Sequence, residues 1–414
     1  MPERLTPKDA AILDLEDEVS AAHGLTVGVF DGPEPSFDEL FDLVSDRVRQ
    51  VPRYTQRLKS VPFGIERPVW VDDPTFSVDF HFRHTALPDR RSRNALNAFV
   101  SRQLSQRLDH DKPLWELWFV SGLPDDRWAL VSKVHYAIID GVSGTDLLGL
   151  LASDEESDLG HQQRVPKPLP SDTKLLTGAF MDIATDPLEA YRAVRGVVNK
   201  PYRLARELTG KLSDSRDPDG LGRAVGPHRR WQSTELELDD IRKVRAEHGC
   251  STTDVILAAV TSGIRSYLVE NGKPVPEKID ALIPLAVDAA TGGLSGQVTS
   301  LTAHLPIGTE DPVERLKAIH AQTAPGAEAT GAIAGHILRR QDHFVAPSVL
   351  AQGVRSAMLA ARDSSHIDTV AINVPGPEHT VEVLGRPMVE AYPVIPLPAR
   401  MRIAIAAMSL TDHV

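Results

Sequence analysis

The most restrictive feature of the sequence is a pair of strand-like runs followed by a helix-like run. Residues 115–121 and 128–135 are rich in β-branched and aromatic side chains, and a short polar turn separates them. Residues 147–151 read L-L-G-L-L, which predicts the start of a buried helix. A strand that ends at His135 and a helix that begins after Gly144 would place the residues between them at a corner. Such a corner in an α/β domain can project polar side chains into a cleft.

The sequence before this corner alternates between helix and strand patterns. Residues 36–58 have helical periodicity until Pro52 interrupts it, and residues 94–108 predict a second amphipathic helix. In residues 76–82 apolar and polar side chains alternate, which predicts a strand that is buried on one face. We therefore expect one α/β domain over residues 1–152.

The next segment, residues 153–227, predicts a linker. It starts with an acidic run and continues through three closely spaced prolines. Within it, residues 173–212 have an apolar side and a basic polar side, typical of amphipathic helices. These helices either pack on a neighbouring domain or lie on a membrane surface, and the pattern leaves both alternatives open.

We expect a second α/β block over residues 228–414, with a shortened end. Residues 236–247, 253–268 and 312–321 predict helices, the second with Ser251 or Thr252 as its N-cap. The predicted strands of this block are residues 279–287, 298–305, 370–373, 381–383 and 401–408. The fold class is thus α/β, with two domains that each contain a mixed sheet and flanking helices.

The composition argues against several classes of function. A formal net charge of -12 gives a phosphate backbone no electrostatic attraction, so nucleic-acid binding is not expected. The one cysteine, Cys250, excludes an internal disulfide, and the histidine spacings predict no metal site; no cofactor is expected either. The sequence shows no signal-peptide pattern and no apolar run of about 20 residues. We expect a cytoplasmic protein, with peripheral attachment at the inner membrane face as an alternative.

The corner itself reads K-V-H-Y-A-I-I-D-G-V-S-G over residues 133–144. Acyl transfer to a hydroxyl requires a base that removes the hydroxyl proton as the oxygen attacks the acyl carbonyl, and histidine has a suitable pKa. Asp140 can anchor the turn, and Gly141 allows the chain to bend closely. A histidine five residues before Asp-Gly is nevertheless also compatible with a purely structural polar turn.

The surrounding blocks carry a family resemblance. The run L-D-H-D-K-P-L-W-E-L-W-F-V from Leu108 leads into the corner, and the sequence also contains L-T-P-K-D-A at Leu5, V-P-R-Y-T-Q-R-L at Val51, T-T-D-V-I-L-A-A-V at Thr252 and N-V-P-G-P at Asn373. In this order the blocks resemble the bacterial wax ester synthase/diacylglycerol acyltransferase family, especially its actinobacterial members. That family has the signature H-H-x-x-x-D-G of acyltransferases that use coenzyme A (CoA).

The resemblance implies two chloramphenicol-acetyltransferase-like domains with a tunnel at their interface. The implied reaction transfers a fatty acyl group from acyl-CoA, a substrate rather than a cofactor, to diacylglycerol or a long-chain alcohol. His135, Tyr136, Asp140 and Gly141 fall on the signature, and Asp254, Asn373, Pro375 and Gly376 fall on the second-half blocks. We assign the first four to catalysis and the second four to substrate binding, although a structural turn explains N-V-P-G-P equally well.

The sequence departs from the signature at Tyr136, which occupies the position of the second histidine, regarded as the general base in the family. Because consecutive residues of a strand point to opposite faces, His135 is expected to face away from the tunnel that Tyr136 faces. At pH 7 only ~0.1% of an ordinary tyrosine is ionised. The signature is therefore degenerate, and we expect reduced activity.

Three functions stay open. The first is the acyltransferase, in which His135, a water bound to Tyr136 or substrate alignment replaces the usual base. The second is a catalytically impaired relative that binds acyl-CoA or neutral lipid, at a membrane or lipid-droplet surface, or that partners with an active paralogue. The third is an acyltransferase for a complex-lipid or polyketide hydroxyl.

Overall fold

A computed structural model provides the structure of the chain. It describes residues 2–89, 92–138, 147–152, 166–185, 225–286, 298–324, 354–355, 358–359, 367–374, 380–397, 401–410 and 412–414. Asp140, Gly141, Pro375 and Gly376 lie outside the described residues. Most of the helical pattern in residues 173–212 lies outside them as well.

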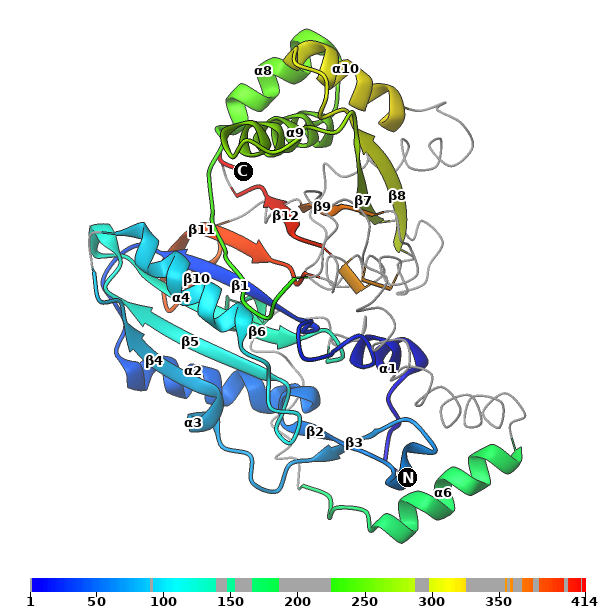
Figure 1. The fold of residues 1–414 in the computed structure, drawn as a ribbon. Coiled ribbons are helices and arrows are strands. Elements are labelled where there is room, and N and C mark those ends of the chain that lie inside the picture. The colour runs from blue at the N-terminus through cyan, green and yellow to red at the C-terminus, as the bar shows by residue number, and fades with distance from the viewer. Residues whose placement is uncertain are drawn as a thin grey trace.

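The first sheet has six strands in the order β10-β11-β1-β6-β5-β4 (Figure 1). Its strands are β1 (His23–Phe30), β4 (Phe82–Ala86), β5 (Trp115–Ser121), β6 (Trp128–His135), β10 (Glu382–Val383) and β11 (Arg386–Val394). The sheet is mixed, because β4 and β5 run parallel while the other neighbours are antiparallel. Strands β10 and β11 come from the last part of the chain, so this sheet uses residues from both sides of the linker that we predict.

Helices cover both faces of the first sheet. Helix α2 (Phe37–Gln50) begins at a capping box of Ser36 and Glu39, and it buries side chains four residues apart against α5 (Leu147–Ala152) and the strands. On the opposite face, α4 (Arg93–Ser105) packs Leu96, Phe99 and Val100 against β1, β5 and β6. Because it is covered on both sides, β6 is buried at every position.

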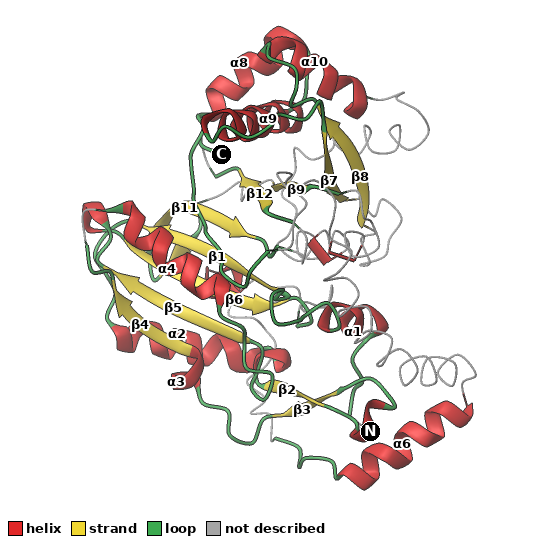
Figure 2. Cartoon of the chain, viewed as in Figure 1, coloured by secondary structure: helices red, strands yellow, loops and turns green. Residues whose placement is uncertain are grey.

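The second sheet has four strands in the order β12-β9-β7-β8. Its strands are β7 (Ile279–Ala286), β8 (Val298–Leu305), β9 (Thr369–Val374) and β12 (Ile403–Met408). Helices α8 (Leu238–His248), α9 (Thr252–Glu270) and α10 (Pro312–Thr323) lie together on one side of this sheet (Figure 2). The two sheets with their flanking helices show the α/β class and the two-part architecture that the sequence predicts.

Smaller elements complete the described part of the chain. They are α1 (Pro7–Leu13), α3 (Val78–His81), α6 (Asp172–Thr185), the hairpin of β2 (Gln56–Lys59) and β3 (Val69–Asp72), and the 3-10 turns Pro52–Tyr54, Pro62–Gly64 and Pro124–Asp126. Within this part of the chain, every helix is too short or too polar to cross a lipid bilayer.

The predicted strand over residues 76–82 is wrong. The chain forms α3 there, and β4 begins only at Phe82. The alternation does not correspond to burial on one face, since Phe80 is 39% exposed, whereas the ring of His81 is buried and stacks on Trp115. Nδ1 of His81 donates to the carbonyl oxygen of Trp115 over 2.7 Å, which fixes the polar residue inside.

Candidate functional site

Strand β6 carries the first residues of the corner motif to the end of the first sheet. His135 pairs with His23 of β1 across the ladder, and the amide of Tyr136 donates to the carbonyl of Ala22 over 2.9 Å. The backbone is thus held by β1 on one side up to Tyr136. Asp140 and Gly141 follow outside the described residues, so their catalytic roles stay predictions.

The side chain of His135 is completely buried, and among the described residues only its Nδ1 has a hydrogen-bond partner. The amide of Ala137 donates to Nδ1 over 3.0 Å. An amide N–H can only donate, so Nδ1 must accept, and in a neutral ring the proton then sits on Nε2. Nε2 lies 3.4 Å from Oε1 of Glu16. His135 therefore lacks an available lone pair with which to act as a general base.

Glu16 is the centre of a buried polar cluster. Its carboxylate accepts from the amide of Ala22 over 2.7 Å, and Oε2 lies 2.7 Å from Nε2 of His110. Burial alone would raise the pKa of Glu16, but hydrogen bonds from His110 and His135 outweigh it and hold this pKa far below its usual value. Glu16 is therefore an anion that orients both imidazoles.

Sequence reasoning missed Glu16, and it dismissed His110 because the spacing of the histidines suggested no metal site. The useful signal was the matched block around Leu108, which contains His110. Glu16 stands among other acidic residues in a polar stretch, and local sequence gives no reason to prefer it. Its role depends on the loop that brings residues 16–22 to the end of β6.

Glu16, His110 and His135 also place ligand-type atoms within 4.8 Å of one another. A histidine that binds a metal usually donates its other N–H to a neighbour. His135 shows the opposite arrangement, because Nδ1 accepts from Ala137 and Nε2 carries the proton. The donor set therefore favours a hydrogen-bonded network over a metal centre, and the expectation that the chain uses no metal stays a prediction.

His23 extends the cluster on the β1 side. Its Nε2 donates to the carbonyl oxygen of Leu104 over 3.2 Å. Burial lowers the pKa of His23 well below its usual value, and the positive charge of Lys133 adds to this effect. His23 is therefore neutral at pH 7 and contributes a buried dipole rather than a charge.

Tyr136 lies on the other side of the strand from His135. Its ring is 6% exposed and packs in an apolar cluster with Ile12 of α1 and with Leu282, Ile372 and Met401 from the second half of the chain. The phenol lies over Gly24, where a Cβ atom would come within 2.4 Å of the phenol oxygen. The phenol thus fills space between the first sheet and the second sheet.

Asp254 of α9 is a buried carboxylate with a complete set of partners. Its Oδ2 accepts from the amide of Ser251 and lies 2.8 Å from Nδ1 of His320, and its Oδ1 accepts from the hydroxyl of Thr323 over 2.5 Å. These bonds cap α9 and join it to α10. The geometry favours a structural role, and substrate binding by Asp254 stays a prediction.

Asn373 of β9 donates to the hydroxyl of Thr253 over 3.2 Å. Its neighbour Ile372 packs in the cluster of Tyr136, so the two residues face opposite sides of the second sheet. Asn373 and Asp254 are therefore grouped at α9, apart from the cluster of His135 and Glu16. Pro375 and Gly376 belong to the part of the chain that is not described, and their roles stay predictions.

An apolar groove with a volume of 440 Å³ lies between α9, β11 and β12. We define the α9 groove by its walls, which are Ile256, Ala259, Val260, Gly263 and Ile264 of α9, residues 389–393 of β11 and Ile403, Ile405, Ala406, Ala407 and Met408 of β12. The segment Thr234, Glu235 and Leu236 and the terminal residues Leu410, His413 and Val414 complete its lining. Its volume lies in the range of ligand sites, ~300–1,000 Å³.

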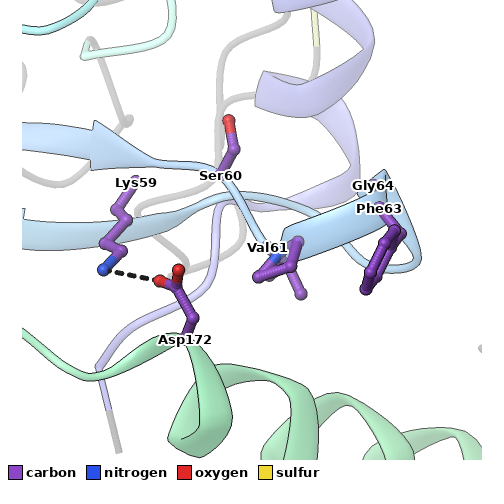
Figure 3. A pocket seen from close by; sticks show the side chains of 7 residues that line it. Lys59, Ser60, Val61, Phe63, Gly64 and Asp172 are labelled. Atoms are coloured by element: carbon purple, nitrogen blue, oxygen red, sulfur yellow. Dashed lines mark ion pairs between the residues drawn. The ribbon is translucent and has the colours of Figure 1, made fainter.

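A second recess lies at the surface beside α6 (Figure 3). Lys59 and Asp172 face one another across it with a 3.0 Å ion pair, and Val61, Phe63 and Gly64 form its far end. None of the signature residues lines this recess. Its charged side chains, Lys59 and Asp172, pair with one another, so we do not take this recess as the candidate site.

Comparison with known proteins agrees with this architecture. Residues 5–256 match the family model of the wax ester synthase/diacylglycerol acyltransferase catalytic domain, and residues 295–414 match the C-terminal domain of the same family. A protein of Mycobacterium tuberculosis, named as a probable diacylglycerol O-acyltransferase, is 29% identical over 99% of this chain and 89% of its own length.

Solved structures share the fold at lower identity. The wax ester synthase/diacylglycerol acyltransferase of Marinobacter aquaeolei VT8 has a TM-score of 0.63 and 23% identity, covering 99% of this chain and 91% of its own. The first condensation domain of the CDA synthetase has a TM-score of 0.54 and 15% identity, covering 99% of this chain and 88% of its own. Since the two family models cover most of the sequence in order, the chain belongs to the wax ester synthase/diacylglycerol acyltransferase family.

Proposed function

We propose that this protein is an O-acyltransferase that moves a fatty acyl group from acyl-CoA to diacylglycerol or a long-chain alcohol, with a low turnover. The observation that carries the proposal is the match of both family models along one chain. The names of the M. tuberculosis and Marinobacter relatives give the reaction and the acceptor classes.

In the proposed reaction the acceptor hydroxyl oxygen forms a bond to the thioester carbonyl carbon. The carbon–sulfur bond then breaks, and the hydroxyl proton ends on the thiol of CoA. This proton needs an acceptor in the transition state. His135 does not supply one, because Ala137 occupies its Nδ1.

Tyr136 supports a low rate for a different reason. A phenol with an ordinary pKa of about 10 is ~0.1% ionised at pH 7, which corresponds to a penalty of roughly 4 kcal/mol for the phenolate. Turnover then depends on alignment of the thioester and the hydroxyl, which alone supplies a large share of the rate enhancement in many reactions.

A catalytically impaired relative is the second candidate. It is favoured by the same pair of observations, the occupied Nδ1 of His135 and the packed phenol of Tyr136. Such a protein would bind acyl-CoA or neutral lipid, or act beside an active paralogue. This second candidate function predicts saturable binding of palmitoyl-CoA with no ester formed. Ester formation by the pure protein would refute this candidate.

The test is a radiolabelled palmitoyl-CoA assay with diacylglycerol and with hexadecanol. We expect slow ester formation by the wild type and a gain of ~10²- to 10⁴-fold in Tyr136→His, because an imidazole restores the base. Tyr136→Phe is the matched control, and it removes the hydroxyl without adding a base. A wild-type rate that stays unchanged in Tyr136→His would show that the reaction does not use this position.

A further inference from the structure

The α9 groove is apolar on the walls formed by α9 and β12, and its β11 wall carries Glu390 and Tyr392 beside apolar residues. Ile256 and Ile264 of α9 face Ile403 and Ile405 of β12, while β11 forms the third side. Water gains few hydrogen bonds on such a surface, and an apolar ligand that fills it would be favoured. The shape between one helix and two strands suits an extended chain.

Helix α9 leaves room for such a chain at Gly263. Glycine in a helix interior destabilises the helix relative to alanine, and a structural reason usually explains it. Here the backbone of Gly263 has no positive φ, and a Cβ atom at this position would meet no atom within 4 Å. Neither backbone conformation nor packing therefore requires glycine. The absence of a side chain at Gly263 widens the groove, and the small side chain of Ala259, one turn earlier, does the same.

The charges at the rim distinguish between the two substrates of the proposed reaction. Glu390 pairs with Arg93 over 2.6 Å and with Arg127 over 2.8 Å, and Glu235 pairs with Arg93 over 2.9 Å. The hydroxyl of Tyr392 lies within 2.7 Å of both carboxylates. Among the described residues that line the groove there is no lysine or arginine. The rim therefore offers no spare cation to the phosphates of CoA, which such side chains usually bind.

The groove also adjoins the corner motif. Ala406 and Met408 of β12 line the groove and pack against the apolar cluster that contains Tyr136. On β11, Pro393 lines the groove, and Ile395 shortly after it belongs to the same cluster. These residues of β12 and β11 thus lie between the groove and the apolar cluster of Tyr136.

We infer that the α9 groove binds the aliphatic chain of the uncharged acceptor, a long-chain alcohol or diacylglycerol, and that Gly263 sets the room for it. This inference rests on the proposed function for the identity of the acceptor. It assigns the acyl chain of acyl-CoA to another part of the molecule. A side chain that fills the groove should therefore weaken binding of the acceptor more than binding of acyl-CoA.

The test uses the whole chain and hexadecanol that carries a photoreactive diazirine in mid-chain. After irradiation and proteolysis, mass spectrometry should find the label on residues 256–264 and 403–408. An excess of hexadecanol should abolish this labelling, whereas an excess of palmitoyl-CoA should leave it within twofold. Label on other segments, or equal competition by palmitoyl-CoA, would overturn the assignment to the acceptor.

Variants give a second measurement. Gly263→Phe should reduce labelling at least tenfold, and Gly263→Leu should reduce it less, since a smaller side chain leaves part of the groove open. Ser266→Phe is the control, because it adds the same ring to an exposed position of α9 outside the groove. This variant should be labelled to the same extent as the wild type. Full labelling of a folded Gly263→Phe would contradict the inference.

The outcome is separable from that of the proposed function. Labelling requires binding alone, so it does not depend on the base at position 136. If no variant, including Tyr136→His, forms an ester while the label still maps to the groove, the acyltransferase proposal fails and the binding site stands. If an ester forms but the label lies on other segments, the acyltransferase proposal stands and the assignment of the groove fails.

Discussion

The phenol of Tyr136 rests on the backbone of β1 at Gly24, and the absent side chain of that glycine makes the space for it. A Cβ atom at Gly24 would lie 2.4 Å from the phenol oxygen and 2.9 Å from Cζ. Real Cβ atoms do not approach other atoms this closely. The glycine and the tyrosine are therefore complementary in shape, so the effect of a substitution at one position on the free energy of unfolding depends on the residue at the other.

Gly24→Ala should lower the free energy of unfolding by about 1–3 kcal/mol, because the buried ring has no free space to move into. In the Tyr136→His background the loss should be smaller, since imidazole is shorter than phenol. Urea unfolding of the four proteins gives the coupling between the two positions. Gly149→Ala in α5 is the control, because a Cβ atom at that position would meet no atom within 4 Å. Equal losses in both backgrounds would disprove the contact.

Glu16→Gln should destabilise the protein by about 2 kcal/mol at pH 7, since the carboxylate accepts several hydrogen bonds as an anion. The pKa of Glu16 in the folded protein lies far below its usual value of 4.5, so the charge stabilises the fold above that value. This contribution is lost progressively as the pH falls below 4.5, where the unfolded chain takes up the proton first. The difference in the free energy of unfolding between the wild type and Glu16→Gln should therefore be constant from pH 7 to pH 5 and become smaller below pH 5.

Urea unfolding at a series of pH values measures this difference. Glu18→Gln is the matched control, because Glu18 is exposed and lies two residues away. Its effect should stay within about 0.5 kcal/mol, as for other surface substitutions. A difference for Glu16→Gln that is the same at pH 3 and pH 7 would show that folding does not lower the pKa of Glu16.

The two strands of the corner could be predicted to the residue, because both are apolar runs with a turn between them. The structure confirms residues 115–121 and 128–135 as β5 and β6. It also confirms Ser251 as the N-cap of α9. The opposite orientations of His135 and Tyr136 follow from the alternation of any strand, so this part of the site needed no tertiary information.

Other features depend on contacts between distant parts of the chain. The pairing of β11 with β1 joins Val394 to Leu25, and nothing in either segment specifies that partner. The contact between Glu16 and His135 depends in the same way on the loop before β1. In residues 76–82 the buried ring of His81 and the exposed ring of Phe80 reverse what hydrophobicity alone predicts. Sequence patterns therefore give the elements, while the partners of buried polar groups require the structure.

Asp254→Ala should cost about 3 kcal/mol, more than the loss of an ordinary helix cap. The carboxylate is 1% exposed and joins the start of α9 to His320 and Thr323 of α10, so its removal leaves several buried groups without a partner. Asp311→Ala, at the exposed N-cap of α10, is the comparison and should cost about 1 kcal/mol. Thermal unfolding and urea unfolding measure both.

A second variant, Asp254→Asn, separates a structural role of Asp254 from substrate binding. It keeps the volume of the side chain and one acceptor oxygen, and its ligand binding is measured well below its melting temperature. If the role is structural, this variant should bind palmitoyl-CoA and hexadecanol within about twofold of the wild type while it melts earlier. A variant that melts as the wild type but loses binding of either ligand would establish the substrate-binding role instead.

Phe63 combines a strained backbone with a side chain that packs on little, so its replacement should stabilise the protein. Its φ of 62° lies in the left-handed region, and its side chain is 82% exposed beside the recess of Figure 3. The left-handed conformation costs a non-glycine residue roughly 1–2 kcal/mol. Phe63→Gly removes this strain but adds about 0.5–1 kcal/mol of backbone entropy. The free energy of unfolding should thus rise by about 0.5–1 kcal/mol in urea titrations. Phe63→Ala, which removes the ring and keeps the strain, should give no such gain, and equal stability of the two variants would contradict the strain argument.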